Sequence, residues 1–270
     1  MTAIAATVDI GRMRGPGWLV ANIGTVTGRN LRRLLRVPTL VAFATVQPIL
    51  FVLLFTYAWG GAVQPPGVER YIDYALPGIW VLSIAFGASQ TGVATADDLA
   101  TGMLDRFRAL PMSRSAVLAG RALADAVRNL FVLALMTAVA YLIGFRFHAG
   151  PTAALAAVGL ALGVGMAFSW IFALLGLLVR DPEPAGTGGL LAIIPLIFTS
   201  STFVPVATFP GWLQAFAKVN PITVTVDALR ALCLGGPTGT PVWQALAWVA
   251  GLLAVTVPAA VRRLRRTTAA

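Results

Sequence analysis

The chain has 270 residues, of which 58% are hydrophobic and only 11% are charged. A soluble domain usually carries about 25% charged residues, so this composition excludes the soluble classes and predicts an all-α integral membrane protein. A single cysteine excludes an internal disulfide, and a single histidine leaves too few ligands for the usual zinc sites.

The net charge of +10 is spread over residues near the ends of apolar runs. That placement fits a membrane surface with anionic lipids better than nucleic acid. Residues 1–36 contain no apolar core of the kind found in cleavable signal peptides. We therefore expect the first apolar run, which begins near Pro38, to act as an uncleaved signal anchor. The excess of arginine over lysine, with abundant alanine and glycine, suggests a GC-rich bacterial genome.

Residues 1–36 are predicted to be cytoplasmic and to include an amphipathic helix lying on the membrane from Trp18 to Arg36. Its polar face is expected to hold Asn22, Thr25, Arg29, Arg32 and Arg36. Its apolar face is expected to hold Val20, Ile23, Thr27, Leu31 and Leu34. A basic face opposite an apolar face is typical of an interfacial helix; a flexible basic tail is the alternative.

Residues 37–261 are predicted to form a six-span domain, because roughly 20 residues cross a hydrocarbon core of about 30 Å. The expected spans are Thr39–Gly60, Leu76–Ala96, Ala122–Phe145, Pro151–Val179, Gly186–Val206 and Val242–Val261. Asp125 and Arg128, near the start of the third span, are expected to pair at the interface. Sixteen of the twenty basic residues lie on the side of the termini, which predicts that both termini are cytoplasmic, including the basic tail 262–270.

The segment from about 202 to 234 is too apolar for a simple external loop and is interrupted by Pro205, Pro210 and Pro221. Short re-entrant helices that dip into the outer leaflet are expected here, because irregular backbone is tolerated at membrane depth where protein covers it. Trp212 and Phe216 are expected at the interface.

A charged island separates the second and third predicted spans. It contains Asp97, Asp98, Asp105, Arg106, Arg108 and Arg114. Ionised groups are costly to bury in hydrocarbon, so the island is expected at or beyond the membrane surface. Thr101–Leu110 can form a short helix with Met103, Leu104 and Phe107 on its apolar face. Such a helix docks into a groove on a soluble partner or lies on lipid headgroups, and the pattern does not separate these two.

The sequence contains little evidence for an enzyme active site. A phosphate loop needs a lysine after a glycine-rich turn, and the only lysine, Lys218, lies in no such loop. An ATPase that drives transport must therefore be another chain. The alternative of a membrane enzyme acting on lipid would need Mg²⁺ on Asp97, Asp98 and Asp105; the simpler interpretation of Asp97 and Asp98 is a helix N-terminal cap.

The predicted spans contain no ionisable residue in their middle, which disfavours an ion-coupled transporter. Their most polar position is Gln90, and a hydrophobic or amphipathic cargo needs no charged groups. Small residues at Ala85, Ser89, Gly92 and Ala96, and the pair Gly159 and Gly163, are more typical of close helix packing than of cargo contact.

The order D-D-x-x-x-G-M-L-D-R-F-x-x-x-P-M-S-R resembles a signature of ABC-2 type export permeases. The matching positions are Asp98, Gly102, Leu104, Asp105, Arg106, Pro111, Ser113 and Arg114. Phe203–Thr223, Asp227–Leu232 and Gly144–His148 are similar to segments of the daunorubicin-resistance-type branch of that family. The resemblance covers nearly the whole chain.

The resemblance implies a permease subunit of an ATP-binding-cassette exporter for an amphipathic drug, antibiotic or lipid. It implies two ATPase subunits, which would bind ATP and Mg²⁺, and a second permease of the same or a related kind, with no cofactor in this chain. A coupling helix at about 98–111 would transmit motion together with Arg29 and Arg32; its implied residues are Asp98, Gly102, Leu104, Asp105, Arg106, Phe107 and Arg108. Spans two and five would line the cargo path, with Ser89, Gln90, Thr199 and Ser200 as candidates. A polysaccharide or glycolipid exporter is the alternative within transport.

Overall fold

The computed structural model describes residues 16–63, 65, 67–102 and 114–267. In these ranges the chain forms α-helices of 9 to 30 residues and one short 3-10 helix. The elements in chain order are α1 Pro16–Arg36, α2 Pro38–Trp59, α3 Tyr71–Ala100, α5 Arg114–Ile143, α6 Gly150–Val179, α7 Pro182–Phe198, η2 Val206–Thr208, α8 Gly211–Val219, α9 Pro221–Leu234 and α10 Gly239–Thr267.

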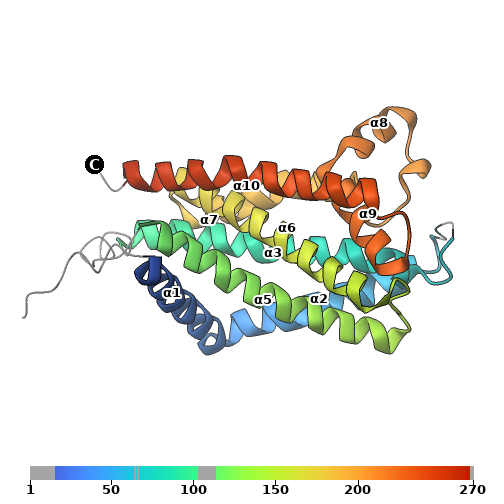
Figure 1. Ribbon diagram of the computed structural model, residues 1–270, viewed down its shortest axis with the longest axis horizontal. Coiled ribbons are helices and arrows are strands. Elements are labelled where there is room, and N and C mark those ends of the chain that lie inside the picture. Colours follow the sequence, from blue (N-terminus) through green and yellow to red (C-terminus); the bar gives the residue numbers. More distant parts are fainter. Residues whose placement is uncertain (1–15, 64, 66, 103–113, 268–270) are drawn as a thin grey trace, which may run out of the picture.

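Five of the described helices are long and apolar enough to cross a membrane. They are Val41–Trp59, Tyr71–Ala100, Leu118–Ile143, Gly150–Val179 and Gly239–Leu264. Each overlaps one of the predicted spans, so the chain is a multi-pass membrane protein. Their long axes run along the length of the molecule (Figure 1).

The fifth predicted span, Gly186–Val206, is wrong in its bounds. The corresponding helix α7 has 17 residues, or about 25 Å, which is shorter than a typical hydrocarbon core. It begins earlier because Asp181 caps it, accepting from the backbone N–H of Glu183, and Pro182 occupies its first turn. It ends at Phe198, where the chain turns away through Thr199 and Ser200.

Helices α3 and α5 are longer than predicted. Each has 30 residues, or about 45 Å, and so exceeds the hydrocarbon core by about 15 Å. Asp97 and Asp98 therefore lie in the last turns of α3. The interpretation of these two residues as an N-terminal helix cap was wrong, because the helix that contains them ends rather than begins there.

Helix α3 is the centre of the bundle, and all the large side chains from Ile79 to Leu82 are buried. It packs closely on α6, because a Cβ placed on Gly176 would clash with the carbonyl oxygen of Gly92. Close packing at the small residues of α3 is thus confirmed. Gly159 behaves differently, since nothing lies within 4 Å of a Cβ placed there, and it makes no tight helix contact with the residues that the structure describes.

Helix α1 starts within two residues of its predicted position and packs against α5. Close approach occurs at Gly120, where an added Cβ would lie 2.7 Å from Cβ of Val26. One face assignment was wrong: Asn22, expected on the polar face, is buried. Val20, expected on the apolar face, is 67% exposed and so is available to lipid. The periodicity located the helix, but the buried stripe is rotated toward Val26 and Thr27 because α5 covers that side.

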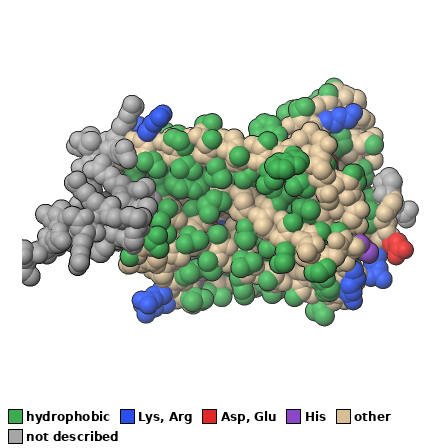
Figure 2. Space-filling model, in the orientation of Figure 1, with side chains coloured by type: hydrophobic (Ala, Val, Ile, Leu, Met, Phe, Trp, Pro, Cys, Tyr) green, Lys and Arg blue, Asp and Glu red, His purple; other side chains and the backbone are tan. Residues whose placement is uncertain are grey.

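The two ends of the bundle carry different elements. Helix α1 and the last turns of α10 lie at one end, called the α1 end below, and α8 lies at the other, called the α8 end (Figure 1). On the face shown in Figure 2, lysine and arginine side chains gather at these two ends and hydrophobic side chains cover the middle. This distribution is the one that a bilayer selects.

Candidate functional site

The α1 end holds a buried ion-pair cluster that joins three helices. Arg121 of α5 lies 2.6 Å from Oδ2 of Asp98 on α3 and also donates to the hydroxyl of Thr95 at 2.7 Å. Arg29 of α1 approaches the same carboxylate oxygen at 3.8 Å. Partial burial lowers the pKa of Arg29, and the negative charge of Asp98 opposes that shift. The cluster ties α1, α3 and α5 together.

A second pair lies closer to the surface. Arg33 of α1 lies 3.5 Å from Asp97 of α3, and the two side chains are 52% and 41% exposed. Both aspartates of the sequence D-D are therefore engaged by guanidinium groups. This arrangement disfavours the alternative of a lipid-modifying enzyme that uses Asp97 and Asp98 as Mg²⁺ ligands.

The predicted coupling residues that the structure describes have different surroundings. Arg32 is exposed on α1, whereas Asp98 is buried within the bundle and cannot itself touch a soluble partner. Gly102 ends α3 with a φ of 65°, a conformation that favours glycine. The remaining predicted residues, Leu104, Asp105, Arg106, Phe107 and Arg108, lie outside the described residues.

Helix α5 carries ionisable side chains near the predicted start of the third span. The expected pair of Asp125 and Arg128 is confirmed, at 3.4 Å, and Thr91 of α3 also donates to Asp125. Because the helix begins at Arg114, before the predicted start of the span at Ala122, Arg121 belongs to the same helix. The spacing of i, i+4 and i+7 places Arg121, Asp125 and Arg128 on one helical face, a signal that would have grouped Arg121 with the predicted pair.

These side chains line a groove of about 630 Å³ between α1, α2, α3 and α5. Gln90 is exposed in this groove, as one of the four predicted cargo-path residues. Its neighbour Ser89 is only 1% exposed and donates to the carbonyl of Phe86. The structure therefore separates these two candidates: Gln90 is accessible, and Ser89 is part of the core.

The other two candidates, Thr199 and Ser200, lie where the chain leaves α7. Thr199 is half-buried, and its hydroxyl donates to the carbonyl of Pro195 at 2.7 Å. Ser200 is buried, donates to the carbonyl of Ile197 at 2.5 Å and shares a hydrogen bond with the hydroxyl of Thr202. Both hydroxyl groups are used to terminate the helix.

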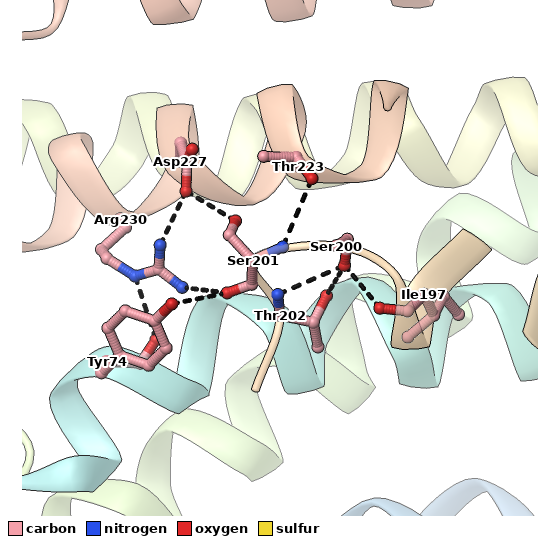
Figure 3. A network of polar contacts seen from close by, with 8 residues as sticks. All are labelled: Tyr74, Ile197, Ser200, Ser201, Thr202, Thr223, Asp227 and Arg230. Carbon is pink, nitrogen blue, oxygen red and sulfur yellow. Dashed lines mark hydrogen bonds and ion pairs between the residues drawn. The ribbon is translucent and has the colours of Figure 1, made fainter. Parts of the chain in front are cut away.

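The neighbouring Ser201 is the centre of a larger polar network, shown in Figure 3. Its carbonyl oxygen accepts from Tyr74 and from Arg230, each at 2.9 Å, and its hydroxyl donates to Asp227 at 2.7 Å. Its backbone N–H donates to the hydroxyl of Thr223. The network satisfies irregular backbone after α7 with side chains from α3 and α9.

Arg230 joins the parts of this network. Its guanidinium lies 2.7 Å from Oδ1 of Asp227, stacks 3.7 Å above the ring of Tyr74, and donates to the carbonyl of Tyr74 at 3.2 Å. No part of the network was recognised from the sequence, although the D-x-x-R spacing at Asp227 and Arg230 is the i, i+3 pattern of a helical ion pair.

Known proteins share sequence similarity with this chain over nearly all of the helices described above. The family model described as ABC-2 type transporter matches residues 21–234, which extend from α1 to the end of α9. The Daunorubicin resistance ABC transporter permease protein DrrB1 of Streptomyces coeruleorubidus is 35% identical over 224 residues, covering 83% of this chain and 79% of that protein. The Probable doxorubicin resistance ABC transporter permease protein DrrC of Mycobacterium tuberculosis is 29% identical over 275 residues, covering 99% of each. The Doxorubicin resistance ABC transporter permease protein DrrB of Mycobacterium tuberculosis is 30% identical over 207 residues, covering 72% of this chain and 68% of that protein.

Proposed function

The chain belongs to the ABC-2 type transporter family as a permease component, and from this premise we propose that it exports an amphipathic drug, antibiotic or lipid across a bacterial cell membrane. Two copies of a separate ATPase subunit bind ATP and Mg²⁺ and supply the energy. A second permease, identical or related, completes the path. This chain has no nucleotide-binding motif and needs no cofactor of its own.

The observation that carries the coupling part of the proposal is the ion-pair cluster at the α1 end. The proposed coupling segment, about 98–111, follows directly from the end of α3, which Asp98 ties to Arg121 of α5 and to Arg29 of α1. A displacement of this segment by the ATPase pair is therefore passed to two spans and to the surface helix together. Arg32, exposed on α1, is a proposed contact with the ATPase.

The proposed orientation places the α1 end in the cytoplasm. The excess of arginine at this end supports it, because basic residues are retained on the cytoplasmic side. The helices α8 and α9 then face outward. In support of a re-entrant path, the side chain of Asn220 at the start of α9 donates to the carbonyl of Leu196 in α7, and the carbonyl of Cys233 near its end accepts from His148. Of the predicted cargo contacts, we retain the exposed Gln90 and the half-buried Thr199, because Ser89 and Ser200 are fully buried.

The test is purification of the tagged chain from its native membrane in mild detergent, followed by identification of bound subunits and an ATPase assay. We expect a stoichiometric ATPase subunit with the wild-type chain. A variant with Phe107→Ala and Arg108→Ala should lose that subunit and still be found in the membrane. Arg262→Gln, which removes an exposed arginine from α10 at the same end, is the matched control and should retain it. Recovery of the chain without any ATPase would contradict the proposal, and turnover of a lipid by the purified chain with Mg²⁺ alone would favour the enzyme instead.

A further inference from the structure

The groove between α1, α2, α3 and α5 has a polar wall inside the membrane-spanning part of the protein. On α3 its lining extends from Ser83 to Asp97, a rise of about 21 Å along the helix. Arg33 and Asp97, both about half exposed, lie at the end nearest the surface, and Gln47 of α2 also lines the groove. A polar path of this length gives a headgroup somewhere to lie below the membrane surface. Polar and ionisable groups at such depth usually mark a binding or transport path.

The charges that line the groove favour an anion. Arg33, Arg121 and Arg128 line the groove together with the carboxylates of Asp97 and Asp125. Arg121 is also paired with Asp98, and Arg29 approaches the same carboxylate, so these four arginines and three aspartates leave one excess positive charge. Both carboxylates already have partners: Asp97 pairs with Arg33, and Asp125 accepts from Thr91 and pairs with Arg128. A cationic ligand would have to displace these contacts, whereas an anion would meet the excess positive charge.

Arg128 is the side chain placed to receive that anion. Its contacts with Asp125 and with the side-chain oxygen of Asn129 are 3.4 and 3.3 Å, which is long for charge-assisted hydrogen bonds of about 2.7–2.9 Å. The guanidinium lies against α3 at Gly87, where an added Cβ would be 2.7 Å from its Nη2 atom. The absence of a side chain at Gly87 thus creates the space that Arg128 occupies.

Three further polar atoms of the lining lack partners. The hydroxyl of Ser83 and the side-chain nitrogens of Asn30 and Asn129 are buried and make no hydrogen bond within the described part of the chain. All three groups can donate, so the wall has unused capacity for hydrogen-bond acceptors. Phosphate oxygens are such acceptors, and arginine is the residue best suited to bind them.

The groove also has apolar lining that reaches the lipid-facing surface. Phe43 of α2 lines it and is 67% exposed, and Phe86 of α3 and Val132 of α5 line it too. A soluble anion has no use for this surface, whereas acyl chains do. We propose that the groove binds the phosphate-bearing headgroup of an anionic phospholipid, with Arg128 as its cationic anchor and the acyl chains leaving past Phe43.

The test measures lipid binding to the purified full-length chain by native mass spectrometry. The probes are dioleoylphosphatidylglycerol and dioleoylglycerol, which share their acyl chains and differ in the phosphate headgroup. We expect a retained adduct with phosphatidylglycerol only. A variant with Asp125→Asn and Arg128→Gln, which leaves no carboxylate unpaired, should weaken that adduct about tenfold or more. Arg262→Gln should bind as the wild type does.

A second variant keeps the test decisive if the double variant does not give a monodisperse protein. Gly87→Ala retains every charge but displaces the Arg128 guanidinium, and it should weaken the phosphatidylglycerol adduct while Gly28→Ala, at a position with nothing within 4 Å, should not. Equal binding of dioleoylglycerol, or unchanged phosphatidylglycerol binding in both groove variants, would overturn the proposal. Displacement of the lipid by millimolar inorganic phosphate would overturn its assignment to a lipid.

Discussion

The two ends of the bundle each hold an aspartate–arginine pair against α3, yet the pairs connect different parts of the chain. At the α1 end, Arg121 and Asp98 join side chains of separate regular helices at 2.6 Å. At the α8 end, Arg230 pairs with Asp227 within α9, and its other nitrogens donate hydrogen bonds to the carbonyl oxygens of Tyr74 and Ser201. One pair links helices, and the other satisfies backbone that has left a helix.

This difference suggests a division of roles. Ion pairs between helices can break and form again as the helices move, which suits an end that receives motion from an ATPase. Backbone carbonyls without partners are costly inside a membrane, so the α8 end is expected to be rigid. The predictions below test that contrast.

The largest effect is expected at the α8 end. Arg230→Gln removes the ion pair with Asp227 and the hydrogen bonds to two backbone carbonyls, so it should lower the free energy of unfolding by about 3 kcal/mol. Thermal unfolding of the purified protein in detergent measures the change. Lys218→Gln, at an exposed position of α8, is the control and should change stability by no more than about 0.5 kcal/mol. Equal unfolding temperatures for the two variants would refute a rigid network centred on Arg230.

The buried cluster at the α1 end should give a somewhat smaller stability change and a larger functional one. Asp98→Asn and Arg121→Gln should each cost about 2–3 kcal/mol, less than a fully isolated buried pair because Arg29 and Thr95 remain as partners. The double variant should cost less than the sum of the two, by about 1–3 kcal/mol. Each single variant should also reduce transport, measured as cargo efflux from cells. The loss of transport should be larger than that of an Arg230 variant with the same remaining stability. Strict additivity of the two stability changes would show that the pair is not coupled.

The contact between α1 and α5 is expected to be sensitive to a single methyl group. Gly120→Ala places a Cβ 2.7 Å from Val26 and should destabilise the protein by about 1–3 kcal/mol through overpacking. Gly28→Ala adds the same methyl group to α1 where there is space, so it should be neutral or slightly stabilising. Protease resistance of α1 in the purified protein, compared between the two variants, reports whether the helix has been displaced.

The smallest effect is expected at the outer pair of the α1 end. Arg33 and Asp97 are half exposed, so Arg33→Gln should cost less than about 1 kcal/mol. The same change should become undetectable in about 1 M salt, where exposed charges are screened over about 3 Å. Unfolding measured at low and high salt checks this, and a salt-independent cost would mean that the pair is more deeply buried than its exposure indicates.

Several features of the fold were predictable because they depend on local sequence. Apolar length located the spans, since a helix that crosses hydrocarbon must be apolar along its length. Proline marked the start of α2 at Pro38, where a missing N–H costs nothing. The bounds of α7 were missed because hydropathy ignores the capping signal of Asp181 and Pro182, which starts the helix before its apolar part.

The candidate sites were less predictable. Gln90 was identified by its polarity in an apolar run, and it lines the groove. Arg128 was seen only as a partner of Asp125, because nothing in α5 alone reveals that Gly87 of α3 makes room for it. Ser201 carried no signal at all, since its importance comes from its carbonyl oxygen, which every residue has.

Composition, apolar length and a charged motif are enough to identify a helical membrane protein of a recognisable permease type, because each is a property of a few tens of neighbouring residues. Which charges are buried, and which side chains they contact, depends on the tertiary structure. Asp98 pairs with Arg121, which is 23 residues away in the sequence, and the hydroxyl of Tyr74 donates to the carbonyl of Ser201, which is 127 residues away. Such pairings depend on how separate helices are rotated and placed against one another, and helical periodicity specifies a face of one helix but not the neighbour that covers it.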